Sequence, residues 1–218
     1  MSSRTHVVIF ANGRIDDIES IGDLIHPDEL IVAADGGASH CHRLGITPDV
    51  IIGDFDSVSV DDLYELERAG VQIIRYPERK DYTDLELALL HAKSIGATHA
   101  RIFGALGLRW DQTMANLLLP ASSELSDLNI QLIDGKQRIT VIHAGDLYEI
   151  SGNPGDTVSL IPLDANTGGI STDGLEYPLK DESLAFGATR GISNVLRGKQ
   201  ATVRLSKGML LCVVIRKA

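Results

Sequence analysis

Apolar and polar positions follow two different rhythms along this 218-residue chain. In the first half, short continuous apolar runs alternate with segments of helical spacing. Apolar runs without polar alternation are typical of parallel strands that are buried on both faces of a sheet. The predicted strands are residues 6–10, 30–33, 50–52, 71–74, 101–103 and 130–133. The predicted helices are residues 15–24, 38–44, 60–69, 83–95 and 111–119.

The pattern changes after about residue 138, where helical spacing ends. Short β-like runs follow at residues 158–161, 201–205 and 209–215, and glycines separate them. Residues 206–208 (Ser-Lys-Gly) are predicted to form a hairpin turn between the last two strands. We therefore expect an α/β domain with a parallel sheet over residues 1–138. A small antiparallel β-sandwich or barrel is expected over residues 139–218.

Composition and charge limit the kinds of partner that the protein is expected to bind. Hydrophobic residues make up 44% of the chain and charged residues 23%, which suits an ordinary globular core. The net charge of −10, with no cluster of Lys or Arg, argues against nucleic acid or an anionic membrane surface as partner. No apolar run approaches the roughly 20 residues of a membrane span, and no signal-peptide pattern opens the chain. We therefore expect a cytoplasmic protein in which Cys41 and Cys212 are buried free thiols.

The residues that follow each predicted strand carry the candidate chemistry, because ligands of parallel α/β sheets bind beyond the carboxyl ends of the strands. Glycines at these points let a ligand approach the backbone closely. In chain order the groups are Asn12 and Gly13; Asp35, Gly36 and Gly37; Gly53, Asp54, Phe55, Asp56 and Ser57; Lys80, Asp81, Thr83 and Asp84; and Gly104, Gly107, Arg109 and Asp111. We expect their carboxylates to converge on one edge of the sheet.

Carboxylates packed this densely repel one another unless a cation lies among them. Oxygen donors without a His or Cys spacing favour Mg²⁺, which commonly bridges protein carboxylates to substrate phosphates. Lys80 and Arg109 would then meet the charge on phosphoryl oxygens. The chain has no Walker-type phosphate loop. The residues alone thus predict a magnesium-dependent enzyme of phosphate-group transfer.

Some of these residues also have a purely structural interpretation. Residues 83–86 (Thr-Asp-Leu-Glu) form a capping-box pattern, and Asp111 has the position of an N-cap. Asp35 would suit a turn with the two glycines that follow it. Asp54 and Asp56 cap nothing evident, so we assign them to function. Residues 40–42 (His-Cys-His) lie on a predicted helix, where consecutive side chains diverge, and this disfavours a metal site there.

Four ordered motifs resemble the thiamine pyrophosphokinase family. They are residues 34–38 (ADGGA), 48–57 (PDVIIGDFDS), 80–86 (KDYTDLE) and 104–112 (GALGLRWDQ). The second half is similar at residues 158–163, 174–179 and 191–194. The resemblance covers nearly the whole chain, and the ordered set of motifs is specific. One departure is Leu108, where the family often has a second glycine.

The resemblance implies an α/β nucleotide-binding domain, a β-sandwich and a homodimer with thiamine bound between subunits. It implies transfer of the β,γ-diphosphate of ATP to the hydroxyethyl group of thiamine, with release of AMP. By the resemblance, Mg²⁺ and the ATP phosphates are held by Asp54, Asp56, Asp84 and Asp111. The catalytic set is completed by Asp81 and Arg109. The wider nucleotide-binding set is Asn12, Asp35, Gly36, Gly37, Lys80, Thr83 and Gln112, and thiamine is contacted by Ser193 and Asn194.

Other functions stay open at this point. The segment around Asp54 also resembles that of aspartyl-nucleophile phosphatases, in which Asp54 would form a phosphoenzyme. In those enzymes the motif ends the first strand, whereas here it ends the third. A pyrophosphokinase acting on another alcohol, such as a pterin, and a non-catalytic nucleotide sensor are further alternatives. Either Asp81 or Asp56 would take the proton of the acceptor alcohol.

Overall fold

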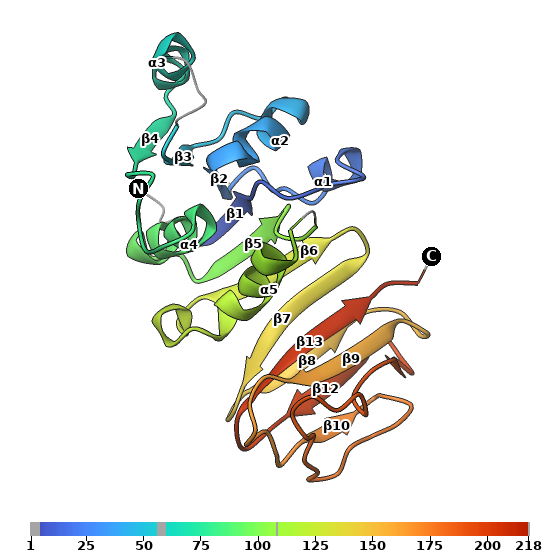
Figure 1. The fold of residues 1–218 in the computed structure, drawn as a ribbon. Coiled ribbons are helices and arrows are strands. Elements are labelled where there is room, and N and C mark those ends of the chain that lie inside the picture. Colours follow the sequence, from blue (N-terminus) through green and yellow to red (C-terminus); the bar gives the residue numbers. More distant parts are fainter. Residues whose placement is uncertain (1–4, 56–59, 108, 218) are drawn as a thin grey trace. The chain divides into compact units, whose positions relative to one another are not determined.

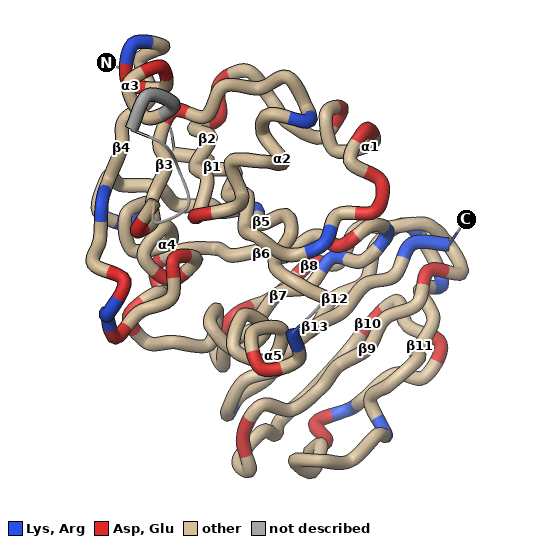
Figure 2. Tube along the Cα trace, turned by 45° about the horizontal axis from the view of Figure 1, so that its top comes forward, with Lys and Arg blue, Asp and Glu red and all other residues tan. Residues whose placement is uncertain are grey.

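The chain folds into two compact units, Met1–Gly135 and Lys136–Ala218 (Figure 1). The structure, a computed structural model, describes residues 5–55, 60–107 and 109–217. None of its described helices is long and apolar enough to cross a membrane. Acidic positions are spread along both units rather than gathered in one segment, with basic positions among them (Figure 2).

A parallel sheet forms the centre of the first unit. Its strands lie in the order β6-β5-β1-β2-β3-β4, and each neighbouring pair is parallel. The chain therefore adds β2, β3 and β4 on one side of β1 and then β5 and β6 on the other. The strands are β1 (His6–Phe10), β2 (Leu30–Ala34), β3 (Val50–Gly53), β4 (Gln72–Arg75), β5 (His99–Phe103) and β6 (Asn129–Asp134).

Helices cover both faces of this sheet (Figure 1). On one face, Val8 and Phe10 of β1 pack in a buried cluster with side chains from α1, α2 and α3. On the other face, α4 contacts β1, β2 and β3 and buries Leu85, Ala88 and Leu89. Burial on both faces explains why the strands are continuously apolar. The helices are α1 (Glu19–Gly22), α2 (Ala38–Arg43), α3 (Val60–Arg68), α4 (Asp84–Ser94) and α5 (Trp110–Leu118), with short 3₁₀ turns η1 (Asp35–Gly37), η2 (Leu119–Ala121) and η3 (Ser123–Leu125).

The predicted helix over residues 15–24 is wrong over most of its length. Only α1 forms, and it has four residues. Asp17 causes the late start, because its Oδ1 accepts a hydrogen bond from the Ser20 backbone N–H at 3.3 Å and its carbonyl accepts one from Ser20 Oγ at 3.0 Å. Such local bonds stabilise a turn in place of the first helical turn.

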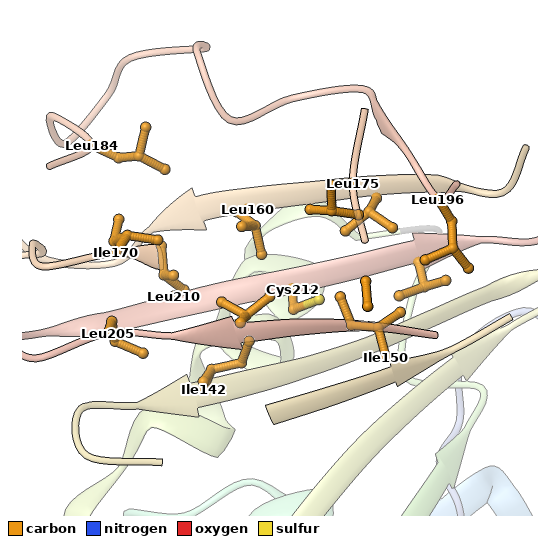
Figure 3. Close-up of a cluster of buried hydrophobic side chains, with 14 residues drawn as sticks. Ile142, Ile150, Leu160, Ile170, Leu175, Leu184, Leu196, Leu205, Leu210 and Cys212 are labelled. Atoms are coloured by element: carbon orange, nitrogen blue, oxygen red, sulfur yellow. The ribbon is translucent and has the colours of Figure 1, made fainter. Parts of the chain in front are cut away.

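The second unit is a sandwich of two antiparallel sheets. One sheet has the order β11-β9-β13-β7 and the other β10-β12-β8. Apolar side chains such as Ile142, Leu160 and Cys212 fill the space between them (Figure 3). No helix occurs among the described residues from 136 onward, as predicted. The strands are β7 (Gln137–His143), β8 (Leu147–Ser151), β9 (Thr157–Pro162), β10 (Ser171–Asp173), β11 (Asn194–Val195), β12 (Gln200–Arg204) and β13 (Met209–Ile215).

The predicted hairpin at residues 206–208 is wrong. β12 pairs with β8 and β10, whereas β13 pairs with β7 and β9. The segment therefore carries the chain from one sheet of the sandwich to the other. Partners distant in sequence decide this pairing, and the turn residues alone do not reveal them.

Both cysteines are buried free thiols, as predicted. Burial raises the pKa of Cys41 and of Cys212 to about 12, because the thiolate would lose its solvation. Neither thiol is therefore an activated nucleophile.

Candidate active site

A cavity lies where the sheet changes the direction of its strand order, between β1 and β5. Ligands of open α/β sheets bind at such a switch point, beyond the carboxyl ends of the strands. The cavity has a volume of about 210 Å³. The segments after β1, β2 and β5 and the first turns of α4 and α5 surround it. It is lined by Ala11, Asn12, Gly13, Ala34, Asp35, Thr83, Asp84, Leu85, Gly104, Ala105, Gly107, Gln112, Ala115 and Asn116.

Asp35 reaches this cavity through an unusual backbone conformation. Its φ of 47° lies in the left-handed region, which non-glycine residues seldom adopt. Asn12 Nδ2 donates a long hydrogen bond of 3.5 Å to Asp35 Oδ2. The two glycines that follow are required by close packing, because a Cβ at Gly36 would overlap the Asn12 side chain and one at Gly37 would overlap the Phe10 carbonyl. The Asp-Gly-Gly sequence thus allows the chain after β2 to pack closely against the end of β1 and the segment that follows it.

Asp84 lies in the first turn of α4 and is neutralised by Lys80. Lys80 Nζ is 2.5 Å from Asp84 Oδ1, and both side chains are largely buried, with 12% and 27% of their surface exposed. Thr83 is the N-cap of α4, and its Oγ1 accepts a hydrogen bond from the Glu86 N–H at 3.2 Å, as predicted. The cap fixes the start of α4 and so holds Asp84 at the cavity wall.

Arg109 lies just before α5 and Asp111 lies in its first turn. The two form an exposed ion pair with two hydrogen bonds. Arg109 Nε and Nη2 donate to the two Asp111 carboxylate oxygens at 3.1 Å and 2.5 Å. The Arg109 hydrogen bond lowers the pKa of Asp111 and the Asp111 carboxylate raises the pKa of Arg109. Asp111 is not an N-cap. That position belongs to Arg109, whose side chain makes no capping bond.

The structure brings together only part of the set named from the sequence. Eight of those residues line the cavity, namely Asn12, Gly13, Asp35, Thr83, Asp84, Gly104, Gly107 and Gln112. Gly36 packs against Asn12, and Lys80 forms an ion pair with Asp84. Both therefore lie behind residues that line the cavity. The residues that do not line it are Gly37, Gly53, Asp54, Phe55, Asp81, Arg109 and Asp111. Asp56, Ser57 and Leu108 lie outside the described residues.

Asn116 is a polar lining residue that the sequence reasoning missed. Asn116 lies one helical turn after Gln112 on α5, so the two side chains share a face. Its Nδ2 donates to the Ala105 carbonyl at 2.7 Å. This bond ties α5 to the segment after β5. The spacing of four residues from Gln112 was the available signal.

The donor set of the cavity suits a hard cation. Carboxylate and amide oxygens from Asn12, Asp35, Asp84 and Gln112 line it, and no thiol or imidazole does. Among the described residues, no three His, Cys, Asp or Glu side chains are grouped closely enough to hold a metal without other ligands. Mg²⁺ usually takes only one or two protein carboxylates and completes its shell with phosphate and water. The residues present therefore fit Mg²⁺ bound together with a phosphate ligand.

His40 supports the wall of the cavity. It is buried on α2, and its Nε2 donates to the Gly13 carbonyl at 2.8 Å. Gly13 in turn donates its N–H to the Gly104 carbonyl at 2.7 Å. His40 thus fixes the segment after β1 against the segment after β5.

A separate cavity of about 320 Å³ lies in the second unit. It is lined by Leu160, Tyr177, Pro178, Leu179, Arg190, Gly191, Ile192 and Asn194. The Asn194 amide makes three hydrogen bonds, since Oδ1 accepts from the N–H of Tyr177 at 3.0 Å and of Val195 at 2.9 Å while Nδ2 donates to the Tyr177 carbonyl at 2.8 Å. Asn194 therefore shapes the wall of this cavity by fixing Tyr177.

Ser193 does not line the second-unit cavity. Its φ of 60° places it in the left-handed region, and its N–H donates to Ser159 Oγ at 3.1 Å. This strained turn sets the direction in which the chain enters β11.

The parallel sheet, the oxygen-lined cavity at its switch point and the appended β-sandwich define a two-domain enzyme of the α/β class. Comparison with known proteins specifies that class further. The family model described as "Thiamin pyrophosphokinase, catalytic domain" matches residues 21–132, and "Thiamin pyrophosphokinase, vitamin B1 binding domain" matches residues 145–210. The chain belongs to the thiamine pyrophosphokinase family.

Individual relatives agree with this assignment. The chain is 29% identical over 206 residues to the thiamine pyrophosphokinase of Bacillus subtilis (strain 168), an alignment that covers 94% of this chain and 96% of that protein. It is 26% identical to thiamine pyrophosphokinase 1 of Arabidopsis thaliana, over 87% of this chain and 79% of that protein. The crystal structure of the Bacillus subtilis enzyme matches with a TM-score of 0.84, at 28% identity, and covers 98% of this chain and 100% of the other.

Proposed function

We propose that this protein transfers the diphosphate group of ATP to the hydroxyethyl group of thiamine, giving thiamine diphosphate and AMP. The observation that carries the proposal is the convergence of three family motifs on one cavity. Asp35, Asp84 and Gln112 come from motifs far apart in the sequence, and all three line the cavity at the switch point. Both family models also match in order along the same chain.

The reaction requires one bond to form and one to break at the β-phosphorus. The thiamine hydroxyl oxygen attacks this atom, and the bond between it and the bridging oxygen on the α-phosphorus breaks. The bridging oxygen leaves with AMP, and the hydroxyl proton passes to a carboxylate. Asp81 and Asp56 are the two candidates for that base. Positioning and charge stabilisation contribute most of the acceleration in such transfers.

The residues named from the sequence have distinct roles in this proposal, although only some of them line the cavity. Asp54, Asp56, Asp84 and Asp111 are proposed to hold Mg²⁺, which when bound would neutralise phosphate oxygens and fix their orientation. Lys80 keeps the Asp84 carboxylate compensated and adds positive charge near the cavity. Arg109 is exposed and paired with Asp111 through Nε and Nη2, and the N–H groups that this pair leaves over can bind phosphate oxygens. Asn12, Gly36 and Gly37 shape the wall around Asp35.

The second-unit cavity is the proposed thiamine site. Its Tyr177 and Ile192 are exposed side chains that can cover an aromatic ring, and Arg190 at its edge is paired with Glu182. Asn194 acts there by holding the wall through its bonds to Tyr177, and the Ser193 N–H is bonded to Ser159 beside it.

A homodimer is part of the proposal. Trp110, Met114 and Leu118 occupy one face of α5 at intervals of four residues and are 82%, 51% and 46% exposed. An exposed apolar stripe of this kind is typical of a surface that a partner covers. Light scattering should give the mass of two chains, and a Met114→Lys substitution should shift that mass toward one chain. A cytoplasmic location is also part of the proposal, because the proposed donor ATP is abundant there.

The alternatives receive less support. In aspartyl-nucleophile phosphatases the motif follows the first strand, whereas Asp54 follows β3. A pterin acceptor would not account for the match to the vitamin B1 binding domain. A non-catalytic sensor would need fewer carboxylates than the chain carries after its strands.

Formation of AMP from Mg-ATP, measured with and without thiamine, tests the proposal. We expect AMP to appear only when thiamine is present, in amounts equal to thiamine diphosphate. Release of inorganic phosphate without thiamine, or binding of ATP with no turnover when thiamine is added, would contradict it.

A further inference from the structure

The same dipeptide, Thr-His, leads into two neighbouring strands of the parallel sheet. Thr5 and His6 lead into β1, and Thr98 and His99 lead into β5. The two strands lie side by side (Figure 1), and their register places His6 opposite His99. The histidines are therefore adjacent in space although they are far apart in the chain. They lie at the amino ends of the strands, at the opposite edge of the sheet from the candidate active site.

The two imidazole rings are stacked and exposed. Their centroids are 4.6 Å apart and their planes differ by 13°. Both His6 and His99 are exposed to solvent. Adjacent parallel strands in register are related by a translation, so equivalent atoms of the two side chains lie beside each other.

A threonine hydroxyl holds the Nδ1 atom of each ring. Thr5 Oγ1 lies 3.0 Å from His6 Nδ1, and Thr98 Oγ1 lies 3.0 Å from His99 Nδ1. Thr98 Oγ1 donates its own hydrogen to the Thr5 carbonyl at 3.2 Å. The same oxygen therefore accepts the hydrogen of His99 Nδ1, which leaves a lone pair on His99 Nε2. His6 has the same arrangement when its hydrogen is on Nδ1 and Thr5 Oγ1 accepts it.

The Nε2 atoms of both rings are open to a ligand. Among the described residues, none hydrogen-bonds to either of them. A neutral imidazole that is held by a partner on one nitrogen and open on the other is a common ligand of transition metals. Partial burial, and then the neighbouring His6, lower the pKa of His99, so its neutral form predominates at pH 7.

The spacing of the rings allows one ion to bridge them after a small movement. Two metal–nitrogen bonds of about 2.1 Å at a tetrahedral angle place the nitrogens about 3.4 Å apart. Rings stacked at 4.6 Å therefore have to approach by about 1 Å at their Nε2 edges, which exposed side chains can do. In the part of the chain that the structure describes, no third His, Cys, Asp or Glu joins the pair. Water would complete the coordination shell, so the ion would exchange with solvent.

We propose that His6 and His99 form a Zn²⁺ site, in which the two Nε2 atoms bind one ion. Imidazole nitrogens suit Zn²⁺, whereas Mg²⁺ prefers oxygen, so this site is chemically distinct from the oxygen-lined cavity. The ion links the amino ends of β1 and β5, and the segments after the carboxyl ends of the same strands line that cavity. Its binding therefore stabilises the centre of the sheet at the edge away from the phosphate chemistry.

Calorimetric titration of Zn²⁺ into the full-length protein tests this site, with Mg²⁺ in large excess to occupy oxygen ligands. The wild type should show one strong Zn²⁺ site per chain. His6→Gln and His99→Gln should each weaken it by at least tenfold. The double variant should bind within about twofold of either single variant, because one lost ligand already abolishes a two-point site. His42→Gln is the matched control, since His42 is exposed on α2 and lies outside the pair.

Thr98→Val keeps both imidazoles and removes the hydroxyl that holds His99 Nδ1, so Zn²⁺ affinity should fall by about tenfold. Zn²⁺ should raise the melting temperature of the wild type and leave that of His99→Gln unchanged. Melting curves without Zn²⁺ show that each variant is folded. Absence of a strong site in the wild type, or full binding by either His→Gln variant, would overturn the proposal. So would single variants that each lose only half of the bound ion, which is the result for two independent histidines.

Discussion

The cavity in the first unit and the cavity in the second unit are built in opposite ways. The first collects short polar side chains from segments that follow separate parallel strands, and its residues come from motifs spread over about a hundred positions. The second is bounded by apolar and aromatic side chains from one stretch of the β-sandwich, residues 177–194, together with Leu160. A parallel sheet can gather charge at one edge, whereas a sandwich offers apolar surface shaped by turns.

This contrast supports a division of labour in which phosphate chemistry belongs to the first unit and recognition of the acceptor to the second. Substitutions in the two regions should therefore affect different kinetic constants. Changes around the first cavity should lower kcat, and changes around the second should mainly raise the KM for thiamine.

The largest effect is expected from Asp54→Asn. The change keeps the size of this half-buried side chain and removes its charge, so kcat/KM should fall by about 10³-fold or more while thermal unfolding changes little. Steady-state kinetics and a melting curve measure the two effects. Asp146→Asn, an exposed position in the second unit, should behave as wild type. An active Asp54→Asn enzyme would contradict the assignment of Asp54 to the site.

Lys80→Met should affect both activity and stability. The variant leaves the Asp84 carboxylate largely buried without its partner 2.5 Å away. A loss of roughly 1–3 kcal/mol in the free energy of unfolding is expected, with kcat lowered by about 10²-fold. Lys80→Arg keeps the charge and should recover most of the stability. If Lys80→Met had normal stability and activity, the pair would have no role in the site.

Asn194→Ala tests the role of the second-unit cavity. It removes three hydrogen bonds that fix the Tyr177 backbone and the start of β11. The KM for thiamine should rise by about tenfold, while the KM for ATP stays unchanged. An equal rise in both KM values would mean that the two cavities do not divide the substrates as proposed.

The smallest expected effect is on the pH dependence of the free energy of unfolding. Burial lowers the pKa of His91, and burial together with the neighbouring His6 lowers the pKa of His99. As the pH falls below the ordinary value of 6.5, these two histidines therefore take up protons in the unfolded chain before they do so in the folded chain. Their contribution to the free energy of unfolding is complete above pH 6.5 and is lost below it. Urea titrations between pH 5 and pH 7.5 should show less pH dependence for His91→Gln than for wild type, and an equal slope would contradict this.

Much of the first unit could be predicted because its signals are local. Continuous apolar runs identified strands that are buried on both faces, and the Thr83 cap was evident from four consecutive residues. Errors arose where a distant partner or a competing side-chain bond decides the structure. Asp17 delays α1, Arg109 takes the N-cap position in place of Asp111, and β12 and β13 pair within different sheets.

The candidate site was predicted in part for the same reason. The residues after the strands were found by their positions, and seven of them line one cavity. Asn116 was missed because its role depends on sharing a helix face with Gln112. A further cavity of the first unit, about 160 Å³ in volume, was missed because it exists only where the segments after β1, β5 and β6 meet.

Transfer of the diphosphate group is the central claim, and an isotope measurement tests it directly. ATP labelled with ¹⁸O at the oxygen between the α- and β-phosphorus is incubated with Mg²⁺, thiamine and the protein, and the products are analysed by mass spectrometry. Attack at the β-phosphorus predicts that the label remains entirely in AMP and that thiamine gains two unlabelled phosphoryl groups. Label in the thiamine product, or formation of ADP and thiamine monophosphate, would contradict the account.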